Sequence, residues 1–597
     1  MKKTRFSPTH SVVLFLAVCS LVATTKADNT KTIRSKEIEV TGKFLIYPVG
    51  KSIPNEDRAG LELFEAGQGG GDAKPLRSWA APLVGSNIFD WRFCDVGELR
   101  GKKMTLRVSK YSERLGGWDK IHQSDEFMPR SFTDESGTQF HQLYTEPKRP
   151  QFHFTAMRGW LNDPNGLVYA NGQYHLFFQH DPVDADKSWG HAVSADLVHW
   201  KELPVAIRPE RGTWAYSGSA IVDHNNVTGL KSKENKGDLI LAFYSHIHHR
   251  GGFECLAYSN DNGLTFKHGP VSETGLRHPP GHNGRDPKVI WHEPTKSWIA
   301  VIFDRRPWSS SKEWGPDEGH GVVFYSSKDL LNWKYESRFI AVKGPYECPE
   351  FFELPVDGDA KTSKWILQEA SSRYFIGEFD GHEFKSDYMR DGWPVGFLQT
   401  PSGTFYAAQT WNDIPKSDGR RIQIAWGRIG GQKEWEQQML FPCELSLRAT
   451  KEGPRLFTNP VREIRNLYKD KVYRWTKVKL EKGKRASFDV DEQFLDMSFV
   501  LKASDDAAIH LNVHGEGKRL GVMEKGESPL APRNGKLSVR ILKDTTSMEI
   551  FAFDGEVYIP MGSNTPPDNR ELTFTLVAGE CEIESLEAHG LKSAWKE

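Results

Sequence analysis

Cysteine is scarce in this chain of 597 residues, which has six, and the five that follow the N-terminal segment are scattered without a CxxC pair. That spacing excludes a disulfide framework and a zinc site built from paired cysteines. Beyond the N-terminal segment, no stretch approaches the roughly 20 consecutive apolar residues that a membrane-spanning helix needs. An excess of one charge is also missing, because 78 Lys and Arg stand against 79 Asp and Glu. A balanced chain lacks the clustered cations that hold nucleic acid or anionic lipid.

Signatures of bound metals and cofactors are missing as well. The chain has neither an EF-hand calcium loop nor a glycine-rich phosphate loop, so no cofactor is expected. The one tempting cluster is His246, His248 and His249. His246 and His248 would share one face of a strand, but no third ligand is identifiable. We interpret the cluster as a polar strand end and predict no metal site.

The first 27 residues have the pattern of a cleavable export signal. Lys2, Lys3 and Arg5 precede an apolar run over residues 11–23, and small residues then offer a cleavage site before residue 28. The run is too short to span a bilayer. Cys19 follows Val18, where a lipoprotein signal would carry a smaller residue, so lipid anchoring is not expected. We predict a secreted or periplasmic protein.

A unit of short strands recurs five times between residue 152 and about residue 458. Each unit opens with a short strand and continues with a more apolar one, and in the first four a third strand ends in a tight turn before an aromatic residue. The opening strands are expected at 163–169, 217–223, 286–292, 349–355 and 404–411. Repeats of this size, built from strands with Gly- and Asp-bearing turns, are typical of propeller blades. We predict a five-bladed β-propeller over residues 148–458. The alternative, one long β-sandwich, gives no reason for this order to repeat.

Two further β-rich regions flank the repeats, so the predicted fold class is all-β. Residues 459–597 contain seven or more short alternating strands without the repeated unit, which is typical of a β-sandwich. Residues 28–147 form an additional N-terminal β-rich domain. Its Trp79, Trp91 and Trp118 suggest that it supports the propeller or extends ligand binding, because flat apolar rings suit both packing and stacking.

Three carboxylates stand at the openings of separate repeats: Asp163 in WLNDPNG, Asp286 in RDPKV and Glu347 in YECPEF. The innermost strands of a propeller converge on one axial funnel, so their ends bring distant residues together. A single Asp-Pro at a strand start is ordinarily a turn residue, but three acids at equivalent places argue against that reading. Convergent carboxylates in an aromatic-walled funnel are what the hydrolysis of a glycosidic bond needs.

Glu350 competes with Glu347 for the third position. The two residues are three apart, and an odd separation along a strand places them on opposite faces. Only one of them can therefore face the funnel, and the spacing alone does not choose between them.

The motifs WLNDPNG, RDPKV and YECPEF, together with WGHAVSADLVHW, YSGSAIVD and FYAAQTW, resemble those of glycoside hydrolase family 32, the invertase, inulinase and levanase family. The resemblance covers the repeats and extends into the C-terminal region, where LSVRILKDTTSMEIFAFDG is similar to the closing strands of the family. Tyr216 replaces a more usual Phe, and Thr404 stands where many members carry an acid, which leaves fine specificity open.

The resemblance implies a role for each acid: Asp163 as nucleophile, Glu347 as general acid/base and Asp286 as transition-state stabiliser. It implies retaining hydrolysis of β-D-fructofuranosides in fructans, and of sucrose, through a covalent fructosyl-enzyme. It also assigns six residues to the fructose subsite: Asn162, Gln179, Trp189, Tyr216, Ser217 and Arg285.

Electrostatic expectations accompany these roles. Arg285 would favour the charged form of a nearby carboxylate, whereas Glu347, close to the negative charge of the nucleophile, would hold its proton longer. By resemblance Cys348 tunes that acid, while a small buried apolar side chain is the alternative. Two other functions stay open: a fructosyltransferase on the same scaffold and a fructan-binding protein without catalysis.

Overall fold

The computed structural model describes residues 31–51, 53, 57–68, 73–125, 144–181, 187–208, 213–248, 251–269, 276, 284–306, 319–341, 347–386, 396–397, 403–431, 434–523, 528–566 and 568–595. The predicted export signal, residues 1–27, lies outside these residues. The described part of the chain contains strands and short 3-10 turns but no α-helix, which confirms the all-β prediction. No helix in these ranges is long and apolar enough to cross a membrane.

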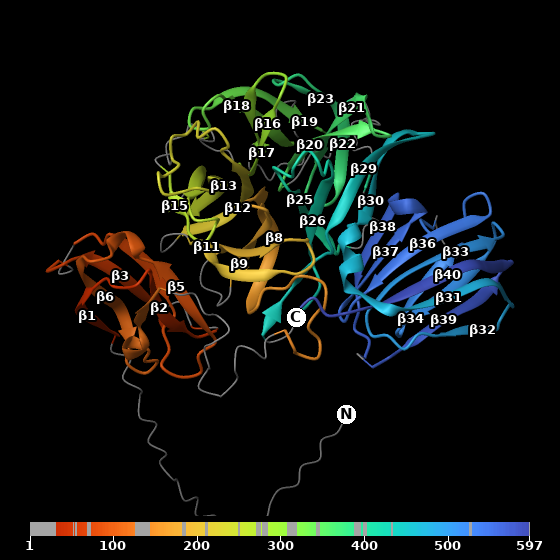
Figure 1. The fold of residues 1–597 in the computed structure, drawn as a ribbon, viewed down its shortest axis with the longest axis horizontal. Coiled ribbons are helices and arrows are strands. Elements are labelled where there is room, and N and C mark those ends of the chain that lie inside the picture. Colours follow the sequence, from red (N-terminus) through yellow and green to blue (C-terminus); the bar gives the residue numbers. More distant parts are fainter. Residues whose placement is uncertain are drawn as a thin grey trace, which may run out of the picture.

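Residues 31–125 form two sheets around a core of their own (Figure 1, red to orange). The sheets are β1–β6–β3–β4 and β5–β2–β7, with bounds β1 (Lys31–Glu39), β2 (Phe44–Val49), β3 (Ala59–Glu65), β4 (Arg77–Ala81), β5 (Asp90–Asp95), β6 (Lys103–Ser112) and β7 (His122–Ser124). Trp79 and Trp118 are less than one-tenth exposed in this core, and Trp91 packs against Met157. The rings of Trp79 and Trp118 therefore serve the packing of this core.

Five antiparallel units follow one another around the upper part of the molecule (Figure 1). The first three are β8 (Gly159–Ala170), β9 (Gln173–Asp181), β10 (Ser188–Ser194), β11 (Lys201–Ile207); β12 (Thr213–Val222), β13 (Ile240–His248), β14 (Gly251–Ser259), β15 (Lys267–His268); and β16 (Arg285–His292), β17 (Ser297–Arg306), β18 (Gly319–Ser327), β19 (Lys334–Ile340).

The fourth and fifth units share one sheet, because β20 pairs with β29 in parallel. They contain β20 (Glu350–Val356), β21 (Asp359–Gln368), β22 (Arg373–Phe379), β23 (Phe384–Ser386), β24 (Gly396–Phe397), β25 (Phe405–Thr410), β26 (Arg421–Gly427), β28 (Gln438–Met439), β29 (Cys443–Thr450) and β30 (Gly453–Pro460). The short β27 (Trp435–Glu436) pairs with β8 of the first unit. The opening strands also contact one another in a closed order, β8–β12–β16–β20–β25–β8.

The repeated turn before each aromatic residue has a local physical cause. In the first unit, Asp196 Oδ1 accepts the backbone N–H groups of Val198 and His199 at 3.1 and 2.9 Å. Trp200 Nε1 then donates to the carbonyl of Leu197 at 3.0 Å. The same contacts recur around Asp329 in the third unit. A short carboxylate side chain that satisfies backbone donors favours such a turn, which explains the spacing seen in the sequence.

Residues 468–591 form a second pair of sheets with a separate core between them (Figure 1, blue). The strands are β31 (Tyr468–Leu480), β32 (Arg485–Asp489), β33 (Leu495–Ala503), β34 (Ala508–Val513), β35 (Glu516–Gly521), β36 (Lys536–Lys543), β37 (Ser547–Ala552), β38 (Val557–Gly562), β39 (Glu571–Ala578) and β40 (Cys581–Leu591). The sheets are ordered β31–β40–β33–β36–β37–β38 and β32–β39–β34–β35.

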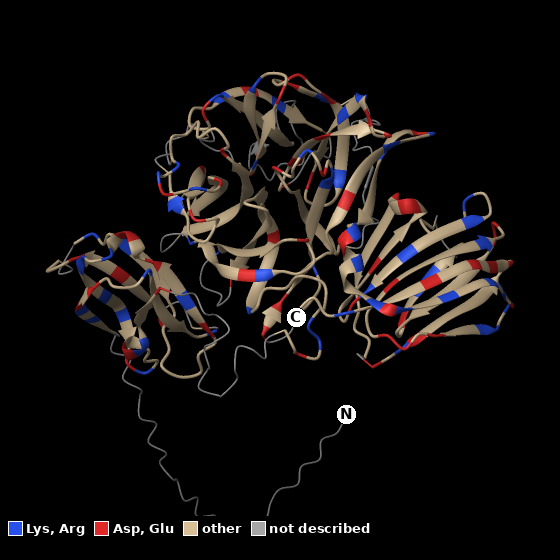
Figure 2. Cartoon of the chain, viewed as in Figure 1, with Lys and Arg blue, Asp and Glu red and all other residues tan. Residues whose placement is uncertain are grey.

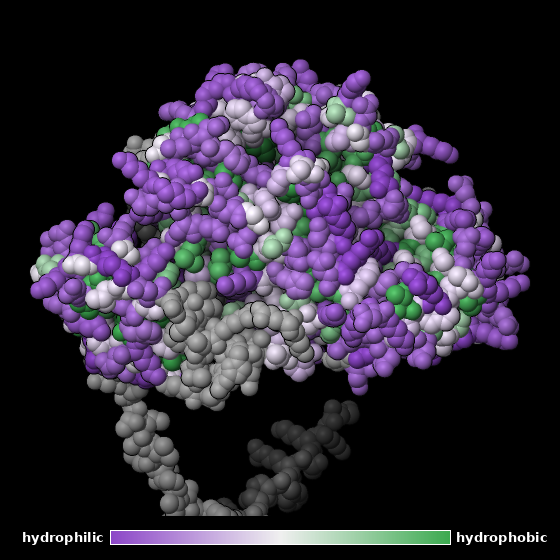
Figure 3. Space-filling view, in the orientation of Figure 1, coloured by the Kyte–Doolittle hydropathy of each residue, from purple (hydrophilic) through white to green (hydrophobic). Residues whose placement is uncertain are grey.

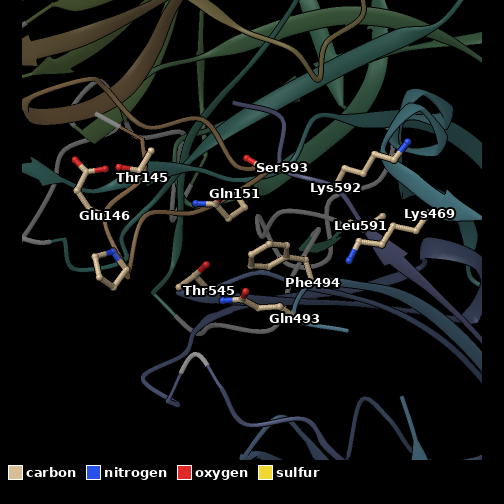
Figure 4. A pocket seen from close by; sticks show the side chains of 11 residues that line it. Thr145, Glu146, Gln151, Lys469, Gln493, Phe494, Thr545, Leu591, Lys592 and Ser593 are labelled. Carbon is tan, nitrogen blue, oxygen red and sulfur yellow. The ribbon is translucent and has the colours of Figure 1, made fainter. Parts of the chain in front are cut away.

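The repeated units and the C-terminal sheets are packed together rather than merely linked. Leu542, Phe551 and Tyr558 of the C-terminal sheets belong to the same buried cluster as side chains of the first, fourth and fifth units. Beside this junction lies a cavity of about 610 Å³ (Figure 4), lined by Thr145, Glu146, Pro147, Gln151, Lys469, Gln493, Phe494, Thr545, Leu591, Lys592 and Ser593. None of the predicted site residues lines it.

The surface agrees with the balanced composition. Basic and acidic residues alternate over the strands without a large field of one sign (Figure 2). The face seen in Figure 3 is mostly hydrophilic, with apolar residues in small groups. The five cysteines among the described residues, Cys94, Cys255, Cys348, Cys443 and Cys581, are all free.

Candidate active site

Shifts in the pairing register of the opening strands orient the predicted site residues. The pairing of β8 with β9 shifts between Leu161 and Pro164, where Asp163 lies. The pairing of β16 with β17 shifts between Arg285 and Lys288, where Asp286 adopts a left-handed backbone with φ 63°. Extra residues of this kind bend a strand and redirect side chains, and they are frequent beside active sites. Similar shifts occur in β12 beside Ser217 and in β25.

The Asp163 carboxylate is partly exposed and is held from two sides. Ser217 Oγ donates to its Oδ2 at 2.6 Å, and the Cys348 thiol lies 3.5 Å from the same oxygen. The thiol also lies 3.6 Å from Asp286 Oδ2. Cys348 therefore links Asp163 to Asp286, and burial together with these carboxylates raises the pKa of its thiol.

Asp286 is buried, with 6 % of its surface exposed. The backbone N–H of Cys348 donates to its Oδ2 at 3.1 Å, and Arg285 Nε lies 3.6 Å from that oxygen. Burial raises the pKa of Asp286 to about 7 despite the opposing charge of Arg285, and the charges of Glu347 and Asp163 add to the rise. Arg285 favours the charged form of Asp286, as the sequence predicts, but desolvation has the larger effect on its pKa.

Glu347 lies just before β20, and each of its carboxylate oxygens has a different partner. Arg285 Nη2 donates to Oε1, and the Tyr406 hydroxyl donates to Oε2 at 2.5 Å. Burial would raise the pKa of Glu347, but the charge of Arg285 and these two hydrogen bonds hold it below its usual value. The prediction that this acid retains its proton longer is therefore wrong, because its pKa is lowered and not raised.

Glu350, the competing acid, points into the interior. Its side chain is 1 % exposed and forms an ion pair with Lys288 Nζ at 2.7 Å, while Thr410 Oγ1 donates to Oε1 at 2.7 Å. The Glu347 side chain is instead 38 % exposed. The two acids therefore face opposite ways, as their odd spacing predicts: Glu347 lies in the site and Glu350 in the interior.

The six predicted subsite residues separate into two layers. Ser217 and Arg285 contact the acids directly. Tyr216 is half-buried, and it lies close enough to Arg285, Asp286 and Glu347 for their charges to affect its phenol. Burial raises the pKa of this phenol.

Three other members of the set lie behind the acids or beside them. Trp189 has no exposed surface, and its Nε1 donates to the carbonyl of Tyr216 at 2.9 Å. Gln179 is 2 % exposed and donates to the carbonyl of Ala215. Asn162 accepts from Trp160 Nε1 at 2.9 Å. Trp189 therefore supports the site from behind and does not present an exposed surface to it.

Sequence reasoning missed two residues that shape the site. Tyr406 lies in the quoted motif FYAAQTW, and its place in the fifth opening strand was the available signal. Ser245, on a second strand, accepts the backbone N–H of Asp286 at 2.8 Å and donates to Glu254 at 2.8 Å. No pattern in the sequence marks Ser245.

Among the described residues, no three His, Cys, Asp or Glu side chains are grouped so as to hold a metal ion. His246 stacks on Phe253 with ring centroids 5.2 Å apart, and His248 meets the same ring edge-on. His249 lies outside the described residues.

The cluster combines carboxylates in different protonation states. Glu347 is biased toward the ionised form and Asp286 is half-protonated near neutral pH, with Arg285 between them. Carboxyl groups whose environments separate their pKa values are the usual elements of acid/base and nucleophilic catalysis.

Known proteins resemble both the sequence and the fold. The profile of the glycosyl hydrolases family 32 N-terminal domain matches residues 153–460. A levanase of Bacillus subtilis is 31 % identical over 510 residues, which cover 76 % of this chain and 72 % of the relative. An extracellular exo-inulinase of Aspergillus ficuum is 29 % identical over 534 residues, covering 76 % of this chain and 96 % of the relative. The crystal structure of an exo-inulinase from Aspergillus awamori superposes with a TM-score of 0.64 at 24 % identity, over 76 % of this chain and all of that one.

Proposed function

The chain belongs to glycosyl hydrolase family 32 and is a glycosidase, and from that premise we propose that it cleaves β-D-fructofuranosidic bonds in fructans, and in sucrose, with retention of configuration. Levan and inulin are the polymers named by its relatives. Asp163 attacks the anomeric carbon, Glu347 protonates the leaving oxygen, and water then resolves the fructosyl-enzyme with Glu347 as base. Asp286 stabilises the charge that develops on the ring.

One observation carries this proposal: the three acids share partners. Cys348 lies within 3.6 Å of both Asp163 and Asp286, and Arg285 contacts both Asp286 and Glu347. Acids from three separate repeats thus meet in one cluster. Ser217 orients Asp163, which leaves the partly exposed carboxylate available for attack.

Glu347 has to take up a proton from solvent as the substrate binds before it can act as the general acid, because Arg285 and Tyr406 favour its ionised form. Hydroxyl groups of the fructosyl ring that take over the hydrogen bond of Arg285 would raise the pKa of Glu347. The basic limb of the kcat profile, which reports the bound enzyme, should therefore lie at higher pH than that of kcat/KM, which reports the free enzyme. Coincident basic limbs would refute this step.

The domain architecture is part of the same proposal. We take residues 28–147 as an accessory β-rich domain, 148–458 as a five-bladed catalytic propeller and 459–597 as a β-sandwich. The closed contact order of the five opening strands supports the propeller. Residues 1–27 are proposed as a signal peptide that directs the enzyme to the periplasm or the medium.

Substitution of the acids tests the chemistry. Asp163→Asn and Glu347→Gln should each lower fructose release from levan, inulin and sucrose by about 10³-fold or more, since each removes a group that acts on the reacting bond. Asp329→Asn, in a turn of the third unit, is the control. Full activity in Asp163→Asn would refute the assignment of Asp163 as the nucleophile. Detection by NMR of the inverted anomer as the first product would exclude retention of configuration. Oligosaccharides formed at high sucrose would indicate fructosyl transfer.

A further inference from the structure

A platform of four side chains borders Glu347 on the side of Tyr406. We call Trp160, Tyr406, Trp426 and Arg428 the Arg428 platform. Trp426 meets both Trp160 and Tyr406 edge-on, with ring centroids 6.0 Å apart in each pair. The guanidinium of Arg428 lies 3.6 Å from the centroid of Tyr406 and 4.9 Å from that of Trp426.

The two oxygens of Glu347 divide the site into two sides. Oε1 accepts a hydrogen bond from Arg285, which also contacts Asp286, so that side holds the nucleophile and the stabiliser. Oε2 accepts a hydrogen bond from Tyr406, which belongs to the Arg428 platform. A general acid stands at the bond it protonates, with the attacked sugar toward the nucleophile and the leaving group away from it. The platform therefore lies where the leaving group must sit.

Arg428 is the member of the platform with free hydrogen-bonding capacity. Its side chain is exposed, and none of the ion pairs formed among the described residues includes it. Its backbone is fixed, since its N–H donates to the carbonyl of Thr404 at 2.8 Å. A guanidinium held over an aromatic ring can still present N–H groups to a ligand, and its five donors form a rigid fork. Adjacent sugar hydroxyls are suitable acceptors for such a fork.

We propose that Arg428, braced by Tyr406 and Trp426, binds the hydroxyl groups of the sugar that leaves, and so sets the preference for saccharide over simple alkyl leaving groups. This inference rests on the proposed fructoside hydrolysis. The ligand class is a neutral fructosyl or glucosyl residue. Because Arg428 is also one of the charges that lower the pKa of Glu347, its removal has a second, independent effect on the pH profile.

The test compares two substrates that differ only in the leaving group. Methyl β-D-fructofuranoside releases methanol, whereas a fructose disaccharide releases a sugar. Loss of hydrogen bonds from a charged donor should lower kcat/KM of Arg428→Gln for the disaccharide by about 10- to 100-fold. For the methyl fructoside, kcat/KM at the optimum should change by less than about twofold, since no sugar hydroxyl is lost.

Two further variants separate this role from a structural one. Arg428→Lys keeps the charge but not the fork, so it should lose selectivity while the basic limb of the pH profile stays in place. In Arg428→Gln that limb should move to higher pH with both substrates. Arg533→Gln is the matched control, because Arg533 also lies over an aromatic ring, 3.9 Å from the centroid of Phe553 in the C-terminal sheets.

The outcomes are distinct. Equal losses on both substrates, or no loss on the disaccharide, would overturn the assignment of Arg428 while leaving the proposed function intact. Failure of the unsubstituted enzyme to cleave either substrate would overturn the proposed function, and the subsite with it.

Discussion

A buried ionic network between the repeated units and the C-terminal sheets should make the stability of this enzyme fall in alkaline solution. His153, just before β8, places Nδ1 2.8 Å from Asp544 and Nε2 2.6 Å from Glu549. All three side chains have no exposed surface. A protonated imidazole between two carboxylates satisfies all three groups, whereas removal of one partner from such a cluster leaves a buried charge uncompensated.

The size of the effect follows from the pKa of His153. Burial alone would lower that pKa, but the hydrogen bonds and charges of Asp544 and Glu549 raise it from 6.5 to about 9. At about 1.4 kcal/mol per pH unit, this rise corresponds to about 3 kcal/mol of folding free energy. Because the pKa of the folded state lies above that of the unfolded state, the stabilisation is complete below pH 6.5. It is lost progressively as the pH rises through about 9.

The difference between the unsubstituted protein and His153→Gln isolates this contribution. The free energy of unfolding, from urea titrations followed by tryptophan fluorescence, should differ by about 3 kcal/mol at pH 6 and converge toward pH 10. His199→Gln is the control, because His199 forms a similar contact with Asp196 at 2.9 Å but is 47 % exposed. A constant difference from pH 6 to pH 10 would refute the reasoning, since it would mean that the contribution of His153 to stability does not depend on its protonation over this range.

Three other substitutions probe the site. Tyr406→Phe removes a hydrogen bond that lowers the pKa of Glu347, so the basic limb of the kcat/KM profile should move to higher pH; an unmoved limb would contradict the contact. Glu350→Gln should cost about 3–5 kcal/mol of stability by leaving Lys288 unpaired. The activity of its folded fraction should survive, and abolished turnover would return the acid role to that residue. Gly166→Ala should destabilise the fold by about 2 kcal/mol, measured by urea unfolding, because φ is +53° and a Cβ would lie 2.7 Å from a tryptophan ring; an unchanged midpoint would show that the ring yields.

The strands of the repeats could be predicted because their composition carries the signal. Alternating and apolar runs located the first two strands of all five units and the third strand of the first four within a few residues. The Asp-bearing turn before Trp200 and Trp333 marked the end of the third strand. The fourth strands were missed because they lie at sheet edges and are short or polar, as with Lys267–His268. Edge strands bury little surface, so their sequences are weakly constrained.

The candidate acids could be named from their equivalent positions, but the layers around them could not. An odd spacing shows that Glu347 and Glu350 face opposite ways. Only the structure shows that Glu350 is the one that faces inward, where it pairs with the buried Lys288. Likewise, tryptophan is equally suited to a wall or a core, and Trp189 is placed behind the site by the side chains packed around it. Burial depends on contacts between distant segments, which local pattern does not encode.

The electrostatics of the site show why adjacency in the chain misleads. Arg285 precedes Asp286, and their proximity alone predicts a low pKa for the aspartate. The irregular pairing of β16 instead buries Asp286 and sends the terminal nitrogen of Arg285 to Glu347, 62 residues away. Desolvation then governs Asp286, while the ion pair governs Glu347, so their pKa values move in opposite directions. Arg285 therefore lowers the pKa of both acids, but only in Glu347 does this effect, together with Tyr406 and Arg428, outweigh burial. A substrate that engages Arg285 acts on both acids at once.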